Sequence, residues 1–171
     1  MNPENKMQEI GIEKVTVNMG VGPNPEDMKA AQKIIEKITG KKSVQTKCKI
    51  KQPKWNIRPG LPIGLKVTLR NQDSEEFLKK ALSAKDNRLS RKNFDNRGNF
   101  GFGIHEYIDL PGIKYDPALG VRGLDVLVTL KRPGYRIKRR KIKPSAVGKG
   151  HQLGRDNAIE FMVKKFGVVV E

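Results

Sequence analysis

The alternation of hydrophobic and polar positions predicts the first elements of the fold. Residues 9–19 are predicted to form a strand, because apolar residues recur at every second position on both sides of Glu13–Lys14. The phase slips at Glu13–Lys14, so we expect a bulge there or a strand that begins later. The next segment predicts a helix that begins at Pro25, with Asn24 as its cap, and ends at Gly40. Its apolar stripe consists of Met28, Ala31, Ile34, Ile35 and Ile38.

A long basic hairpin is predicted next. Residues 44–51 alternate between apolar and mostly basic positions, which is typical of a half-buried strand with one basic face. Residues 52–62 contain three prolines and a glycine and are predicted to form a loop. Residues 64–70 alternate again and are predicted to be the second strand of the hairpin. A short helix capped near Ser74 follows, and its buried residues are predicted to be Phe77, Leu78, Ala81 and Leu82.

The second half of the chain completes a layered fold. Residues 98–103 are rich in glycine and are interpreted as an irregular loop, with a possible strand at residues 104–108 and a clear one at residues 123–130. A final helix is closed by Gly167, and its apolar face consists of Ala158, Ile159, Met162, Val163 and Phe166. This order of elements predicts an α+β fold, an antiparallel sheet covered by helices on one face. A long basic β-hairpin loop and a basic C-terminal extension that ends in a helix complete it.

The charge of the chain points to the kind of partner. Among 171 residues, 35 are Lys or Arg and 18 are Asp or Glu, which gives a net charge of +17. Residues 41–70 and residues 131–150 each hold nine basic residues and no acidic one. A solubilising surface normally mixes both signs, so we expect these segments to contact a polyanion, foremost nucleic acid. The basic residues singled out in the second segment are Arg132, Arg136, Arg139, Arg140 and Lys141.

Other classes of protein find less support. The single cysteine, Cys48, cannot form an intramolecular disulfide, and His105 and His151 lack neighbours at metal-ligand spacing, so we expect no metal and no cofactor. Gly20–Val21–Gly22 lacks the third glycine of a dinucleotide fingerprint and predicts a tight turn instead. The apolar runs are far shorter than the roughly 18 residues that cross a bilayer. We therefore expect a cytoplasmic chain that is neither an enzyme nor a membrane protein.

Trp55, the single tryptophan, lies within the predicted basic loop. An aromatic ring in a positively charged loop can stack on a base or pack on a ribose. The same ring can also close the loop onto the sheet as a packing residue. The basic residues around it, Lys47, Lys49, Lys51, Lys54 and Arg58, favour RNA without regard to base sequence. The sequence leaves both roles of the tryptophan open.

Four sequence blocks, in register and in the same order, resemble a known family. They are Ile12–Gly22, Pro62–Arg70, Asn93–Phe100 and Val121–Asp125. Together they resemble the ribosomal large-subunit family that binds 5S rRNA, known as the fifth protein of that subunit. From Arg132–Pro133–Gly134 onward the chain is similar to the archaeal branch, in which a basic stretch and a last helix are appended.

The resemblance implies a structural protein of the large subunit and suggests its contacts. The sheet would hold 5S rRNA in the central protuberance, the loop at about residues 47–60 would contact P-site tRNA, and the chain would bridge to a small-subunit head protein. Further implied partners are 23S-type rRNA and other large-subunit proteins. The residues assigned to 5S rRNA are Lys14, Asn18, Gly20, Gly22, Lys41, Thr46, Lys47, Thr68 and Arg70. Those assigned to the tRNA loop are Lys49, Lys51, Lys54, Trp55 and Arg58.

Side-chain chemistry agrees with that assignment. Asn18 and Thr68 suit the reading of 2′-hydroxyls and base edges, while lysines position the phosphate backbone. Gly20 and Gly22 would let RNA approach the main chain closely. We expect a 5S rRNA-binding domain over residues 1–130 and a basic extension over residues 131–171 whose last helix packs back on it. An RNA-processing enzyme, a general RNA-binding basic protein and a membrane-surface protein are the alternatives.

Overall fold

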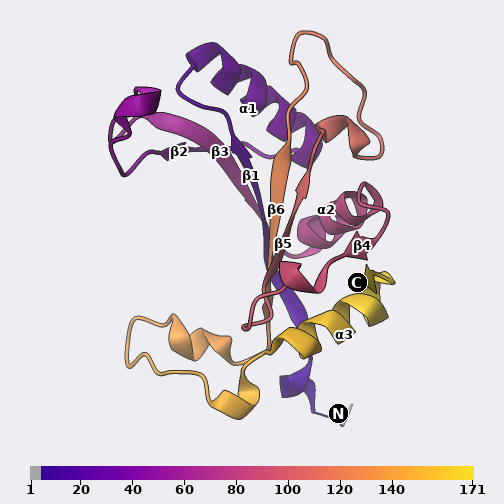
Figure 1. Ribbon diagram of the computed structural model, residues 1–171. Helices are drawn as coiled ribbons and strands as arrows, with labels where there is room; N and C mark the ends of the chain where they lie inside the picture. The colour runs from indigo at the N-terminus through magenta and orange to yellow at the C-terminus, as the bar shows by residue number, and fades with distance from the viewer. Residues whose placement is uncertain (1–4) are drawn as a thin grey trace.

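The computed structural model describes residues 5–171, which form the predicted α+β fold (Figure 1). The start of the expected first domain, residues 1–4, lies outside the described residues. The five-stranded antiparallel sheet has the order β2 (Val44–Lys47), β3 (Pro62–Leu69), β1 (Gly11–Gly20), β6 (Leu124–Lys131) and β5 (Phe100–Ile104). The helices are α1 (Pro25–Thr39), α2 (Gln72–Ser83) and α3 (Arg155–Phe166). Two short strands, β4 (Arg88–Leu89) and β7 (Val169–Val170), pair in parallel and form a separate two-stranded sheet.

The predicted irregularity in the first strand is a β-bulge. Ile12 pairs with Leu130 and Lys14 pairs with Thr129, so Glu13 is the extra residue on β1. Ile12 and Val15 are both buried although three positions separate them, which a regular strand would not allow. The bulge lets the buried positions resume their alternation after it.

Helix α1 confirms the prediction at both of its ends. The Asn24 side-chain oxygen accepts a hydrogen bond from the Glu26 N–H at 3.2 Å, and Pro25 is the first helical residue. Gly40 ends the helix in the left-handed conformation, with φ at 65°, and its N–H donates to the Glu36 carbonyl at 2.8 Å. The predicted stripe is buried, apart from a partly buried Ile38.

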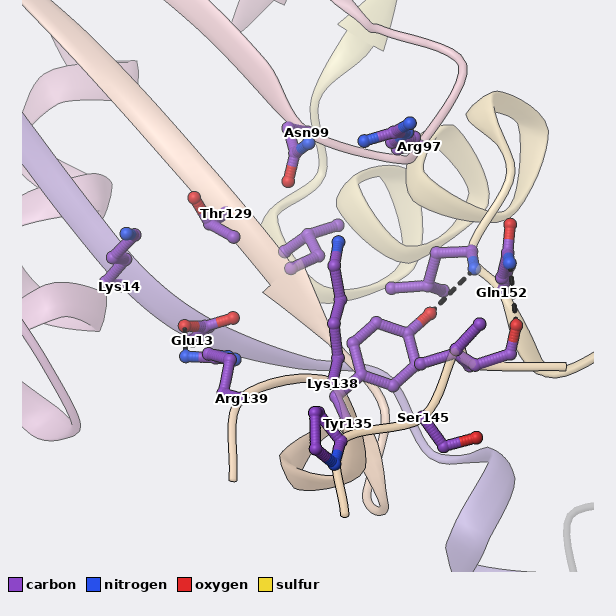
Figure 2. A pocket seen from close by; sticks show the side chains of 15 residues that line it. Glu13, Lys14, Arg97, Asn99, Thr129, Tyr135, Lys138, Arg139, Ser145 and Gln152 are labelled. Carbon is purple, nitrogen blue, oxygen red and sulfur yellow. Dashed lines mark hydrogen bonds and ion pairs between the residues drawn. The ribbon is translucent and has the colours of Figure 1, made fainter. Parts of the chain in front are cut away.

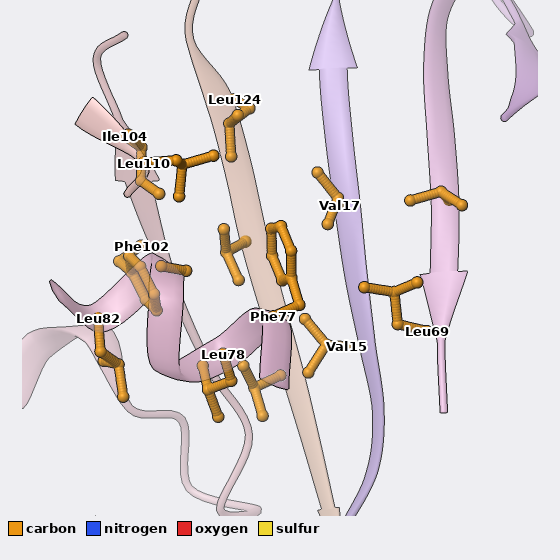
Figure 3. Packing of buried hydrophobic residues seen from close by; sticks show 14 of the residues in the cluster. Val15, Val17, Leu69, Phe77, Leu78, Leu82, Phe102, Ile104, Leu110 and Leu124 are labelled. Carbon is orange, nitrogen blue, oxygen red and sulfur yellow. The ribbon is translucent and has the colours of Figure 1, made fainter. Parts of the chain in front are cut away.

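The core lies between one face of the sheet and the helices. Figure 3 shows Phe77, Leu78 and Leu82 of α2 lying against side chains of four strands. The strand residues labelled there are Val15, Val17, Leu69, Phe102, Ile104 and Leu124. The cap predicted near Ser74 lies three residues earlier, because Ser74 is buried inside the first turn of α2 and donates through its hydroxyl to the Asn71 carbonyl at 2.6 Å. Asn71 occupies the cap position instead.

The strand predicted over residues 44–51 is present only over its first half, and the buried face predicted for it is wrong. β2 ends at Lys47, and Val44 is 61% exposed, so the alternation there marks no buried face. β2 is the edge strand beside β3, where apolar side chains find no helix to cover them. Ile50 is likewise exposed in the loop that follows.

The glycine-rich segment forms a strand where a loop was predicted. β5 spans Phe100–Ile104, with buried side chains at Phe100, Phe102 and Ile104, whereas Tyr107–Asp109 form a short 3-10 turn rather than a strand. The alternating glycines fit the opposite face, because a Cβ at Gly101 would lie 2.7 Å from Leu127 Cδ2 on neighbouring β6. Packing against β6 therefore favours a small residue here, although the end of the Leu127 side chain is half exposed and can move aside.

The C-terminal segment crosses the end of the sheet and returns to the core. Short 3-10 turns at Tyr135–Lys138 and Lys149–His151 lead into α3, which buries Ala158 and Met162 and is closed by Gly167, with φ at 65°. Val163 is exposed, so the predicted apolar face of this helix is narrower than expected. Within residues 5–171, every helix is too short or too polar to span a bilayer.

Candidate nucleic-acid interface

The face of the sheet that the helices leave uncovered is polar, and we call it the open face. Alternate strand residues project to it, and strand pairing sets them in rows across the sheet. One row consists of Val44, Lys66, Asn18, Asp125 and Gly103, and the next consists of Thr68, Thr16, Leu127 and Gly101. The first row carries charges of both signs, and the second is neutral.

Three of the residues assigned to 5S rRNA come together on this open face. Lys14, Asn18 and Thr68 belong to neighbouring strands, and their side chains are partly exposed. The Asn18 amide Nδ2 donates to the Asp125 carboxylate at 3.4 Å, a long hydrogen bond that leaves the amide oxygen without a protein partner within residues 5–171. The face thus offers neutral donors and acceptors beside lysines, which suits a ribose–phosphate surface.

The end of the open face consists of small residues. Gly20 pairs with Gly64, and Gly64 pairs with Thr46, so these residues form a third row. A Cβ on Gly20 would meet no atom within 4 Å. At Gly64, a Cβ would lie 2.9 Å from the Met19 carbonyl oxygen and 3.0 Å from Thr46 Oγ1. The main chain at Gly20 is therefore open to an approaching ligand, whereas Gly64 is packed by its neighbours.

Just beyond this row the chain turns. Gly22 has φ at +94°, and its N–H donates to the Ile63 carbonyl at 3.0 Å. The predicted tight turn is confirmed, and the positive φ is the reason for glycine at this position.

The remaining residues assigned to 5S rRNA lie at the margins. Lys47 and Arg70 are exposed where β2 and β3 end. Lys41 follows the cap of α1 and forms an ion pair with Asp73 in the first turn of α2. The structure thus places the Lys41 ammonium against the helix layer and does not bring it onto the open face.

The basic loop between β2 and β3 is an ordered hairpin extension. Cys48 and Leu61 are joined at its base, where the Cys48 N–H donates to the Leu61 carbonyl at 2.8 Å. At its tip Gln52 and Ile57 exchange hydrogen bonds of 2.9 and 3.1 Å. The residues assigned to tRNA contact are all exposed on this loop: Lys49, Lys51, Lys54, Trp55 and Arg58.

Trp55 is 68% exposed, so the interpretation that it packs the loop onto the sheet is wrong. It lies in a short 3-10 turn over Pro53–Trp55, which Asn56 ends in the left-handed conformation. A large aromatic ring on a basic loop, with most of its surface in solvent, is available to a partner.

The basic extension differs from expectation at Arg132. This side chain is only 6% exposed, and its Nη1 donates to the His151 carbonyl at 3.5 Å, so Arg132 holds the extension together rather than offering its charge to solvent. Arg136, Arg140 and Lys141 are exposed as predicted. Arg139 forms an ion pair with Glu13 on the bulge of β1.

Sequence reasoning missed several residues of the open face. Lys66 and Asp125 flank Asn18 in register, and Leu127 is 50% exposed at the centre of the face. The alternation over residues 123–130 contained this signal, because its polar positions must share the face opposite the buried ones. What was missing was the pairing of β6 with β1, which joins residues more than a hundred positions apart.

The residues considered above for metal binding or catalysis do not lie together with other metal-ligating side chains in the described part of the chain. No group of three or more His, Cys, Asp and Glu residues gathers there to hold a metal ion. His105 and Glu106 are both exposed. His151 Nε2 lies 2.8 Å from the Pro133 carbonyl, which gives this ring a part in folding the extension.

These features define the class: a small, strongly basic α+β protein with a helix-covered sheet and an open polar face. Comparison with known sequences then assigns the family. The family described as ribosomal protein L5 matches residues 5–58, and the family described as the C-terminus of the ribosomal L5 proteins matches residues 62–168. The chain belongs to the ribosomal protein L5 family, and the relatives described next are archaeal.

Three relatives show how complete the match is, and each is named large ribosomal subunit protein uL5. The Nanoarchaeum equitans protein is 49% identical over 98% of this chain and 99% of its own length. The Nitrosopumilus maritimus protein is 44% identical over 98% and 96%. The Sulfolobus acidocaldarius protein is 44% identical over 98% and 94%.

Proposed function

We propose that this chain is a structural protein of the large ribosomal subunit that binds 5S rRNA through the open face of its sheet. As a member of the L5 family, it is a ribosomal protein with a structural rather than a catalytic role, in the cytoplasm. The observation that carries the proposal is the open face itself. Lys14, Thr68 and Asn18 lie there in three successive rows of the paired strands β1 and β3, and the helices leave them uncovered.

The chemistry of the open face favours RNA over a protein partner. A central hydroxyl-rich row, with Thr16 and Thr68 side by side, offers hydrogen bonds at the spacing of neighbouring strands. Lys14 and Lys66 supply positive charge on either side of it. RNA is recognised through such contacts to 2′-hydroxyls and phosphates.

A second contact, with P-site tRNA, is proposed for the basic loop. The loop extends from β2 and β3 beyond the sheet (Figure 1). Trp55 lies in the short 3-10 turn near its tip, and Lys51 and Lys54 beside it are exposed. Charge without acidic neighbours attracts any RNA backbone, and a base can stack on the exposed ring. The loop therefore suits a partner that is held by shape and charge.

The remaining partners are proposed from the family and from charge. They are 23S-type rRNA, other large-subunit proteins and a protein of the small-subunit head. The division into a 5S rRNA-binding domain, residues 1–130, and a basic extension, residues 131–171, is retained as a proposal. The return of α3 to the core, through Ala158 and Met162, supports the part of it in which the last helix packs back on the first domain.

The test of the 5S rRNA site is the variant Thr68→Val, which removes a hydroxyl and keeps the side-chain shape. Specific 5S rRNA binding is expected to weaken by about 1–3 kcal/mol, because an RNA group buried in the complex would lose its partner. The matched control is Ser83→Ala, which removes an exposed hydroxyl from α2 on the helix layer. Full-strength binding by Thr68→Val, measured by filter retention, would remove the open face as the site.

A further inference from the structure

The C-terminal extension and the open face enclose a cavity, which we call the extension groove. Its volume is about 760 Å³. One wall is the sheet, at the bulge of β1 and at Thr129 of β6. A second is the turn before β5, at Arg97 and Asn99, and the third is the extension over residues 135–153. Figure 2 shows Lys138 reaching from the extension up between these walls.

The charge of this groove is unbalanced. Four cationic side chains line it, Lys14, Arg97, Lys138 and Arg139, against the single carboxylate of Glu13. They come from three segments far apart in the sequence, so the fold alone gathers them. Between residues 5 and 171, Lys14, Arg97 and Lys138 form no ion pair. Unneutralised positive charge within a partly enclosed cavity attracts an anion more strongly than the same charge on an open surface.

The β-bulge places the carboxylate inside the groove. In a regular strand Glu13 and Lys14 would point to opposite faces, but the extra residue lets both line the same cavity. The Glu13 side chain is 13% exposed and forms an ion pair with Arg139, whose side chain is 56% exposed. Figure 2 shows this pair beside Lys14. Among the described residues, the groove thus holds one paired cation and three free ones.

The wall formed by the extension is fixed in place. The Tyr135 hydroxyl accepts from the Leu153 N–H at 2.8 Å and donates to the His151 carbonyl at 3.2 Å. Gln152 Nε2 donates to the Val147 carbonyl at 2.8 Å. These bonds tie Tyr135, which begins the turn that carries Lys138, to residues 151–153, so the backbone of this wall is positioned by the fold.

We propose that the extension groove binds one strand of RNA by its phosphates, and that Glu13 competes with the phosphates for Arg139. The inference rests on the RNA-binding function proposed above and extends it to a site that requires the extension. Hydroxyls of Thr129 and Ser145 in the same cavity suit ribose contacts. When a phosphate takes the place of Glu13 at Arg139, the Glu13 carboxylate loses its partner and is repelled by the phosphate. Glu13 therefore lowers the affinity for RNA, whatever the base sequence.

The experiment is a salt titration of a labelled, mixed-sequence single-stranded RNA, followed by fluorescence anisotropy. Lys138→Gln is expected to flatten the slope of log K against log salt by about 0.7, the loss of one phosphate contact on a single strand. Lys164→Gln, which removes an exposed charge on α3 outside the groove, is the matched control and should leave the slope unchanged. Equal slopes for these two variants would overturn the proposal.

The second arm tests the competition. Glu13→Gln is expected to raise affinity and steepen the slope by about 0.7, because Arg139 is freed for a phosphate. Glu160→Gln makes the same change of charge on an exposed face of α3 and should have little effect. Weaker binding by Glu13→Gln would mean that the ion pair only anchors the extension, and would overturn the competition. Lys138→Gln keeps the groove testable if Glu13→Gln folds poorly.

Two readings separate this proposal from its alternatives. The first is competition by a polyglutamate peptide. If the peptide displaces the labelled RNA from the parent protein as well as unlabelled RNA does, and does so less well from Lys138→Gln, the groove binds an acidic protein segment and the proposal that it binds RNA is overturned. 5S rRNA is titrated in parallel at high salt. Loss of 5S rRNA specificity in the parent counts against the proposed function, whereas an unchanged slope in Lys138→Gln counts against the groove alone.

Discussion

Gly20 and Gly64 face each other across β1 and β3, and the structure predicts opposite consequences when each is changed to alanine. They are register partners on the open face, so the two substitutions add the same methyl group to the same row. At Gly64 the new Cβ would lie 2.9 Å from the Met19 carbonyl oxygen and 3.0 Å from Thr46 Oγ1. A main-chain oxygen in the middle of a sheet cannot move aside without disturbing the ladder.

Gly64→Ala is therefore expected to lower the free energy of unfolding by about 1–3 kcal/mol, the usual cost of overpacking. At Gly20 a Cβ would meet nothing within 4 Å, and the residue is not in the left-handed region. Gly20→Ala is expected to keep or slightly raise stability, because alanine restricts the unfolded chain. The same methyl group should weaken 5S rRNA binding, since it occupies the space through which RNA would reach the main chain.

The assay is urea unfolding followed by circular dichroism, paired with 5S rRNA binding for each variant. The reasoning requires a crossed result, in which Gly64→Ala loses stability and Gly20→Ala loses affinity at parent stability. Gly64→Ala as stable as the parent would refute the packing argument. Gly20→Ala with parent affinity would refute close approach of RNA at this end of the face.

Two further predictions concern the loop and the last helix. Trp55→Ala is expected to weaken tRNA binding by about 1–3 kcal/mol through lost stacking, with no change in stability because the ring is exposed; equal tRNA affinity in the variant and the parent would exclude the ring from the contact. Met162→Ala is expected to lower the free energy of unfolding by about 2–5 kcal/mol, measured in urea, because this α3 side chain is fully buried against the core. An unfolding curve identical to the parent's would mean that α3 is not part of the core.

Local sequence signals were sufficient for the elements whose causes are local. The Asn24 cap, Pro25 and Gly40 define α1 through hydrogen bonds within a few residues, and the structure places the helix where they predicted it. The slip of phase at Glu13–Lys14 indicated the bulge for the same reason. Capping and alternation need no knowledge of the rest of the chain.

The predictions that were wrong concern residues whose structure depends on neighbours distant in the sequence. Val44 alternates as in a buried strand, but β2 lies at the sheet edge and no helix covers it. Gly101 indicated a loop, whereas it lies within β5 and pairs with Leu127 of β6. Arg132 was interpreted as one more tail cation, and its burial depends on His151, which lies nineteen positions away.

The candidate site shows the same division. The alternation along β1 and β3 assigns Asn18 and Thr68 to the polar side of their own strands. Only the pairing of β1 with β3 shows that these two sides belong to the same face of the sheet. The ion pair of Lys41 with Asp73 depends on how α1 ends beside α2. The extension groove joins Lys14, Arg97 and Lys138, and no sequence spacing relates these three.

The most direct test of the central claim is a titration of the purified protein against 5S rRNA, tRNA and a scrambled RNA of the length of 5S rRNA, at two salt concentrations. Contacts to phosphates weaken together as salt rises, whereas a site of fixed hydrogen bonds on the open face keeps its preferred RNA. We predict that 5S rRNA stays bound at the higher salt while the scrambled RNA dissociates. If all three RNAs dissociate together, charge alone accounts for binding and the open face is not a 5S rRNA site.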